Sequence, residues 1–337
     1  MRFRTIVFAL LPVFVLSCNT SAPRFHKVKI TGEAQGTYYA ITYFDTKNRN
    51  IQPEIDSLLS AFDRSVSIWV PGSIISRINK NDSTVVVDEW FKGNYELSKE
   101  VFEKTGGAFD PTVGPLVNAW GFGFTDRLKV DSALVDSLLP LVGFDKVRIK
   151  GNKVIKDDNR IQFDFNAIAQ GYSVDLTGKL LESEGIDNFL IDIGGEVLGH
   201  GSKPDGSEWK VGIEKPKDNA SYGEGLKAIV KLKDKALATS GSYRKFYEVD
   251  GVRYSHTIDP KTGFPVQHSL LSVSVLADDC GTADAYATAF MVMGVDKTKE
   301  FLKENSFLEA YLIFPDKAGN LKTWHTKGFA HILDEEY

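Results

Sequence analysis

The sequence contains few of the features that mark specialised classes of protein. Its 337 residues include only two cysteines, Cys18 and Cys280, so a framework stapled by several disulfides is excluded. It has no internal repeat and no low-complexity tract. Basic residues are not in excess either, because 40 lysines and arginines face 45 aspartates and glutamates, a formal net charge of -5. Since nucleic-acid binding needs a basic surface, we expect no nucleic-acid partner.

The first 17 residues have the layout of an export signal. Arg2 and Arg4 precede an apolar run over residues 6–16, which is shorter than the about 20 residues that span a bilayer. The run ends in Val-Leu-Ser-Cys, which resembles the lipobox of bacterial lipoproteins, where the cysteine is acylated and becomes the mature N-terminus. We therefore predict a lipoprotein signal peptide over residues 1–17, lipidation of Cys18 and a tether over residues 18–26. The protein would be exported and anchored to the membrane, facing the periplasm.

Two other interpretations of this segment stay open. It could be an ordinary secretory signal in which Cys18 occurs by chance. A disulfide between Cys18 and Cys280 is less favoured, because Cys18 would lie at the mobile tip of the mature chain.

Residues 27–337 are expected to form one domain that mixes strands and helices. β-Branched and aromatic residues predict strands at 28–30, 38–44, 160–165 and 271–276, with Gly32 and Gly36 in the turn between the first two. Apolar spacing predicts helices at 51–62, 90–105, 167–184 and 282–293, the third capped by Asn166 and the last ended by Gly294. Strands outnumber the βαβ units of a doubly wound sheet. We predict an α+β fold, a single compact domain with a mixed or antiparallel sheet and flanking helices.

Asp284 and Thr288 form the first candidate site. They stand four residues apart in an alanine-rich segment, and on a helix such positions share one face, with Cβ atoms about 5–6 Å apart. Carboxylate and hydroxyl oxygens are hard ligands that suit Mg²⁺. The alternative is a buried hydrogen bond between the two side chains.

Two further segments combine turn chemistry with groups that could act on an anion. His256 precedes Asp-Pro-Lys-Thr-Gly at residues 259–263, and a histidine can act as a general acid or base near neutral pH. Residues 164–172 are predicted to run from a strand into a helix, whose N-terminus favours an anion. A structural turn and a plain strand-to-helix junction are the respective alternatives.

Aromatic residues in two places could hold a flat ring. The glycine-rich segment 106–115 is followed by Trp-Gly-Phe-Gly at residues 120–123, and Trp69 precedes a short helix that Ser73 can cap. The glycine-rich segments could equally form buried turns, and for Trp69 a place in the core is favoured unless other features indicate a flat ligand.

Together and in this order, these segments resemble the FAD:protein FMN transferases of the ApbE family. The resemblance spans nearly the whole mature chain, from residues 32–37 to residues 284–288. It is carried by Gly-Ala-Phe-Asp-Pro-Thr at 107–112, Ile-Gly-Gly-Glu at 193–196, Thr-Ser-Gly-Ser-Tyr at 239–243 and the segments at 256–263 and 284–288. It implies an ApbE-like domain with a T-fold-like core over residues 27–337.

Position by position, the resemblance implies a set of functional residues. Mg²⁺ would be held by Asp284, Thr288 and the backbone carbonyl of Ala167, and His256 would lie beside the diphosphate of FAD. The implied FAD contacts are Gln35, Trp69, Ala108, Phe109, Asp110, Asp164, Gln170 and Ile258. Gln35 and Gln170 depart from the commonest pattern, which has methionine and lysine there. Gln170 replaces the positive charge of a lysine by a neutral amide, which affects the affinity for FAD rather than the fold.

The implied activity is Mg²⁺-dependent transfer of FMN from FAD to a threonine hydroxyl of an acceptor protein, with release of AMP. FAD would be a substrate, and His256, Asp284 and Thr288 would be catalytic. The acceptor threonine would lie in an Asp-(Gly/Ser)-(Ala/Ser)-Thr segment of a respiratory redox-pump or electron-transfer subunit. An acylated Cys18 would hold the enzyme near such membrane proteins, although one acyl chain alone anchors only reversibly.

Two other functions would use the same residues. A Mg²⁺-dependent FAD pyrophosphatase would use water in place of threonine and release FMN and AMP. A non-catalytic flavin-binding lipoprotein would bind FAD without cleaving it, but it would have little need of Asp284, Thr288 and His256.

Overall fold

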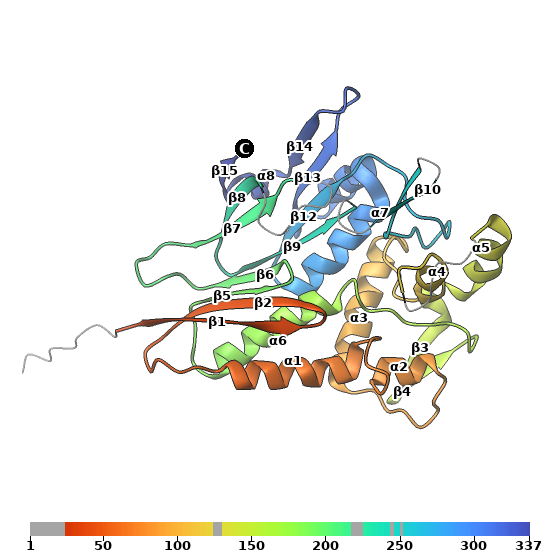
Figure 1. The fold of residues 1–337 in the computed structure, drawn as a ribbon, viewed down its shortest axis with the longest axis horizontal. Coiled ribbons are helices and arrows are strands. Elements are labelled where there is room, and N and C mark those ends of the chain that lie inside the picture. Colours follow the sequence, from red (N-terminus) through yellow and green to blue (C-terminus); the bar gives the residue numbers. More distant parts are fainter. Residues whose placement is uncertain (1–23, 124–129, 217–224, 243–245, 250–251) are drawn as a thin grey trace, which may run out of the picture.

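An eight-stranded antiparallel sheet forms the centre of the computed structural model, which describes residues 24–123, 130–216, 225–242, 246–249 and 252–337 (Figure 1). Its strands lie in the order β1 (His26–Ala34), β2 (Thr37–Asp45), β5 (Phe189–Ile193), β6 (Glu196–His200), β9 (Lys235–Gly241), β12 (Ser272–Ala277), β13 (Glu309–Pro315) and β14 (Leu321–His325). The predicted signal peptide, Cys18 and Tyr243 lie outside the described residues. Within the described ranges, no helix has the length and apolar character needed to cross a membrane.

The first hairpin shows how the sequence builds this sheet. In β2, Tyr39, Ile41 and Tyr43 alternate with more exposed residues and are buried, the period of two that a strand requires. The turn between β1 and β2 is Gln35–Gly36, whose φ angles of 55° and 73° suit the tight turn of a hairpin. The two strands predicted for this hairpin are confirmed, but Gly32 lies within β1 opposite Tyr39 rather than in the turn.

Helices cover one face of the sheet and a smaller sheet covers the other (Figure 1). The helical face carries α1 (Gln52–Val66), α6 (Ala169–Ser183) and α7 (Cys280–Glu304), with α3 (Glu89–Lys104) packed on α1 and α7. The second face packs against β7 (Trp209–Glu214), β8 (Leu226–Leu232) and β15 (Leu333–Glu336) through a separate apolar cluster. The predicted α+β fold with an antiparallel sheet and flanking helices is confirmed.

The remaining elements are short and mostly surround the helical side. They are α2 (Ile74–Asn79), α4 (Gly114–Ala119), α5 (Ser132–Leu138), α8 (Lys327–Ala330), the 3-10 turns η1 (Leu139–Leu141) and η2 (Phe144–Lys146), and the hairpins β3 (Val147–Lys150) with β4 (Lys153–Lys156) and β10 (Phe246–Val249) with β11 (Val252–Ser255).

Two predictions around residue 165 are wrong. Residues 160–165 do not form a regular strand: within the described part of the chain they pair only through an isolated bridge from Gln162 to Val113. Helix α6 starts at Ala169 rather than at residue 167, and Asn166 does not cap it. Instead the Asn166 N–H donates to the Asp164 carboxylate at 2.8 Å. Because an aspartate two residues earlier satisfies this N–H, the chain forms a turn before the helix begins.

The predicted end of the alanine-rich helix at Gly294 is confirmed as a break. Helix α7 continues to Glu304, but Gly294 has φ 74° and ψ -179°, a conformation open essentially to glycine alone. The segment before the break is therefore a separate straight helix, and it is the one that reaches the site described next.

Candidate active site

A single cavity of about 430 Å³ brings together every residue singled out as functional within the described chain. It lies between the helical layer, strand β9 and the loops that follow α3 and precede α6. Its lining includes Gln35, Trp69, Ala108, Phe109, Asp110, Asp164, Ala167, Gln170, His256, Ile258, Asp284 and Thr288. The sequence separates these residues by up to 253 positions, so only the tertiary fold assembles them.

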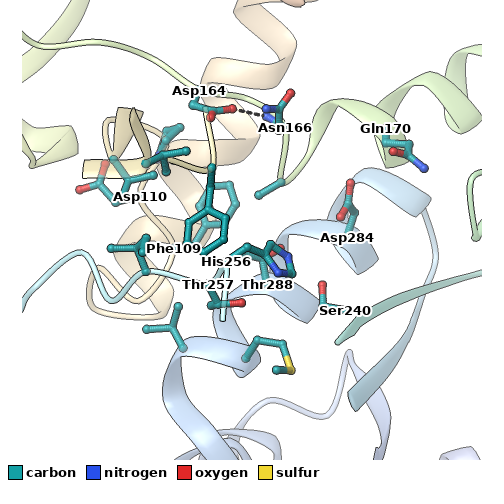
Figure 2. Close-up of a pocket in the computed structure, with 18 of the residues that line it drawn as sticks. Phe109, Asp110, Asp164, Asn166, Gln170, Ser240, His256, Thr257, Asp284 and Thr288 are labelled. Atoms are coloured by element: carbon teal, nitrogen blue, oxygen red, sulfur yellow. Dashed lines mark hydrogen bonds between the residues drawn. The ribbon is translucent and has the colours of Figure 1, made fainter. Parts of the chain in front are cut away.

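The first part of α7 presents Asp284 and Thr288 to the cavity (Figure 2). The helix starts at Cys280 because the Asp279 side chain accepts a hydrogen bond from the Thr282 N–H at 2.8 Å. The two oxygen-bearing side chains then lie one turn apart on the same face, as their spacing predicts.

Asp284 lies in a tight crossing of α6 and α7. Its side chain is 6% exposed, and its Oδ2 accepts a hydrogen bond from the Gly171 N–H at 3.0 Å. A Cβ at position 171 would lie 2.3 Å from the Cys280 carbonyl oxygen, so only glycine permits this approach. Burial raises the pKa of Asp284 from 3.8 to about 7. Because one backbone N–H offsets little of the burial cost, a cation would stabilise this carboxylate strongly.

Asp175 fixes the same crossing from the other helix. Its two carboxylate oxygens accept hydrogen bonds from the N–H groups of Cys280 at 2.7 Å and Gly281 at 2.8 Å. An α6 carboxylate thus binds the start of α7, while Asp284 on α7 binds the start of α6. The position of Asp284 in the cavity is therefore set from both helices.

His256 enters the cavity from the turn that follows β11. The turn is closed by hydrogen bonds from the Gly263 N–H to the Asp259 carbonyl at 2.8 Å and from the Asp259 N–H to the Phe264 carbonyl at 2.9 Å. The imidazole is half-buried, and Phe122 packs against it edge-on at a centroid distance of 6.3 Å. Figure 2 shows the ring between Phe109 and the Asp284–Thr288 face of α7. A candidate base and a candidate metal site therefore share one cavity.

Trp69 and Phe109 are two aromatic residues of the cavity lining. Trp69 is 56% exposed although it lines the cavity, so it does not fill the core. Ser73 caps α2 as predicted, by accepting a hydrogen bond from the Ser76 N–H at 3.1 Å. An exposed indole on a capped, fixed turn is suited to stacking on a flat ligand.

Comparison with known proteins shows the relationship directly. Residues 35–312 match the sequence model of the ApbE family. The chain belongs to the ApbE family. It is 37% identical to the FAD:protein FMN transferase of Vibrio cholerae over 98% of this chain and all of the relative. It is 31% identical to that of Escherichia coli K12, over 99% of this chain and 98% of the relative.

Solved structures of ApbE proteins have the same fold. The flavin transferase ApbE from Vibrio cholerae superposes with a TM-score of 0.82 at 34% identity, covering 92% of this chain and 100% of that one. The ApbE protein of Thermotoga maritima superposes with a TM-score of 0.79 at 28% identity, covering 93% and 100%.

The two positions that depart from the commonest ApbE pattern differ in what they offer to a ligand. Gln170 Nε2 donates to the Ile193 carbonyl at 2.8 Å and to the Glu196 carboxylate, so its amide nitrogen is engaged within the protein. Gln35 Oε1 accepts from Ser173 Oγ at 3.2 Å, whereas its Nε2 is buried without a partner in the described part of the chain. Since a buried unpaired donor is costly, Gln35 is the amide of the two that is better placed to bind a ligand.

Two acidic side chains of this ApbE cavity, Asp110 and Asp164, also accept hydrogen bonds from their own loops. Asp110 accepts hydrogen bonds from the Thr112 N–H at 2.8 Å, the Thr112 hydroxyl at 2.6 Å and the Phe144 N–H at 3.2 Å. Burial nevertheless raises the pKa of Asp110 to about 6, and that of Asp164 is raised for the same reason. Asp110 therefore stabilises the loop. It can act on a ligand site indirectly, by holding the backbone of this loop in position.

The cavity is also lined by Glu196 and Ser240, for which the sequence predicted no role, and by Phe122, one of the aromatic residues that could hold a flat ring. Glu196 and Ser240 lie within motifs that carry the resemblance to the ApbE family, but a sequence does not show in which direction a side chain points. With Glu196, four carboxylates line the cavity, and none of its described lining residues is lysine or arginine. Asp284 and Thr288 bring to the cavity hard oxygen atoms of the kind that Mg²⁺ takes, although the described residues contain no group of three acidic, histidine or cysteine side chains that could hold a metal ion.

Proposed function

We propose that this protein is a Mg²⁺-dependent FAD:protein FMN transferase, which moves FMN from FAD to a threonine hydroxyl of an acceptor protein and releases AMP. Relatives 31–37% identical over nearly full length carry the name FAD:protein FMN transferase. The observation that carries the proposal is the placement of Asp284, Thr288 and His256 around one cavity that also has exposed aromatic surface.

The reaction exchanges the phosphoanhydride bond of FAD for a phosphoester bond to threonine. The threonine oxygen forms a bond to the FMN phosphorus, and the bond from that phosphorus to the bridging oxygen of the diphosphate breaks, so that AMP leaves with the bridging oxygen. The threonine proton passes to His256, which lines the same cavity as Asp284 and Thr288 and would act as the general base. Mg²⁺, when bound, polarises the phosphoryl oxygens and neutralises developing charge.

The other residues of the cavity bind and orient. Asp284 and Thr288 hold the metal together with the Ala167 carbonyl, and Trp69 and Phe109 contact a flat ring. Gln35 supplies a hydrogen-bond donor that the described chain leaves unpaired. Phosphoryl transfer depends largely on such positioning.

We further propose that the protein is exported and acylated at Cys18, as its N-terminal sequence implies. The tether over residues 18–26 would hold the cavity near membrane-embedded acceptors. The acceptor would be a respiratory redox-pump subunit with an Asp-(Gly/Ser)-(Ala/Ser)-Thr segment.

The function is tested by incubating the protein with FAD, Mg²⁺ and an acceptor domain that contains this segment. A flavin-fluorescent acceptor band on a denaturing gel, together with AMP, is expected. An acceptor with valine in place of the threonine is the matched control and stays dark. Release of FMN and AMP without a labelled acceptor would instead identify a pyrophosphatase, and FAD binding without AMP would identify a carrier. Asp284→Ala and His256→Ala are each expected to abolish labelling.

A further inference from the structure

Ser240 is one of the cavity residues to which the proposed function gives no role. It lies on β9, where Ala236, Ala238 and Ser240 alternate toward the helical layer, while Leu237 faces the opposite side. The two alanines are fully buried in the clusters that α7 joins. At the third position the strand reaches the cavity, and the small residue there carries a hydroxyl.

The hydroxyl of Ser240 is directed into the cavity. Figure 2 shows it pointing toward the space bounded by Asp284, Thr288 and His256, and all four residues line the same cavity. The side chain is half-buried and makes no hydrogen bond to other residues that the structure describes. The neighbouring Thr239 also lines the cavity, but its hydroxyl is paired with Ser274 Oγ at 2.7 Å.

We propose that the Ser240 hydroxyl donates a hydrogen bond to a phosphoryl oxygen of the diphosphate substrate. A phosphate oxygen accepts readily, and the four carboxylates of the cavity cannot donate to it once ionised. The metal is already assigned to Asp284, Thr288 and the Ala167 carbonyl on the helical side, so donation to the phosphate rather than metal binding is assigned to Ser240. This inference rests on the proposed function for the identity of the diphosphate.

The test is the affinity of the full protein for ADP in the presence of Mg²⁺, with adenosine as the probe that lacks phosphates. Ser240→Ala is expected to bind ADP about tenfold more weakly, the usual effect of losing a hydrogen bond to a charged group, and adenosine as before. Ser240→Thr, which keeps the hydroxyl, restores most of the ADP affinity. Ser274→Ala, the same change on the other face of the sheet, leaves ADP affinity unchanged even if it lowers thermal stability.

An ADP affinity of Ser240→Ala within threefold of the unsubstituted protein would overturn the inference, as would an equal loss in Ser274→Ala. Absence of Mg²⁺-dependent ADP binding in the unsubstituted protein would overturn it too. If ADP binds as expected but no acceptor is flavinylated, the proposed function fails while the assignment of Ser240 to diphosphate binding stands.

Discussion

Replacing Asp284 by asparagine is expected to stabilise the metal-free protein while removing its response to Mg²⁺. The folded protein holds this carboxylate with one backbone hydrogen bond, and burial raises its pKa from 3.8 to about 7. Because the pKa is higher in the folded protein than in the unfolded one, this carboxyl group does not lower the free energy of unfolding below pH 3.8. As the pH rises from 3.8 to the folded pKa, the group lowers the free energy of unfolding more and more. At pH 8 the difference corresponds to about 4 kcal/mol. Asparagine keeps an acceptor for the Gly171 N–H without the charge.

The assay is chemical denaturation in EDTA at pH 8 and pH 5, followed by the same measurement in Mg²⁺. At pH 8 we expect the free energy of unfolding of Asp284→Asn to exceed that of the unsubstituted protein by about 2–4 kcal/mol. At pH 5 this difference should be smaller by roughly 2 kcal/mol. Mg²⁺ should raise the stability of the unsubstituted protein alone. A variant that is no more stable in EDTA at pH 8, or that still responds to Mg²⁺, would refute the reasoning.

Three further predictions address the same cavity. Because Mg²⁺ binds the ionised form of Asp284, its affinity by titration calorimetry should be about tenfold weaker at pH 6 than at pH 8, and a pH-independent affinity would contradict the assignment. Gly194→Ala should lower the free energy of unfolding by about 1–3 kcal/mol, since φ is 62° and a Cβ would lie 2.2 Å from Gln170 Nε2; an unchanged melting curve would show that the turn adapts. Trp69→Ala should weaken FAD binding about tenfold while changing stability by less than about 0.5 kcal/mol, because the indole is 56% exposed; Trp69→Phe should retain most of the affinity.

Local sequence patterns predicted those parts of the fold in which one physical signal dominates. The alternation in β2, the capping of α2 by Ser73 and the end of the straight helix at Gly294 all appear where expected. The spacing of Asp284 and Thr288 likewise determined that they share a face. In each case the deciding interaction lies within a few residues of the chain.

The wrong predictions involve competition between neighbours or contacts across the fold. Asn166 has the side chain of a helix cap, but Asp164 already binds its N–H, and the helix starts three residues later. Trp69 could have filled the core, and only the tertiary structure leaves it exposed at the cavity. The amide of Gln170 is engaged by Ile193 and Glu196, which lie on a hairpin distant in sequence. This contact leaves Gln35 as the amide available to a ligand, and no local pattern could predict it.

The most direct test of the central claim is peptide mapping by mass spectrometry of an acceptor domain after incubation with the protein, FAD and Mg²⁺. The account predicts FMN, less one water, on the threonine of the Asp-(Gly/Ser)-(Ala/Ser)-Thr segment, and no modification in EDTA. An acceptor that stays unmodified in Mg²⁺, or that is modified equally in EDTA or at a residue other than this threonine, would contradict it.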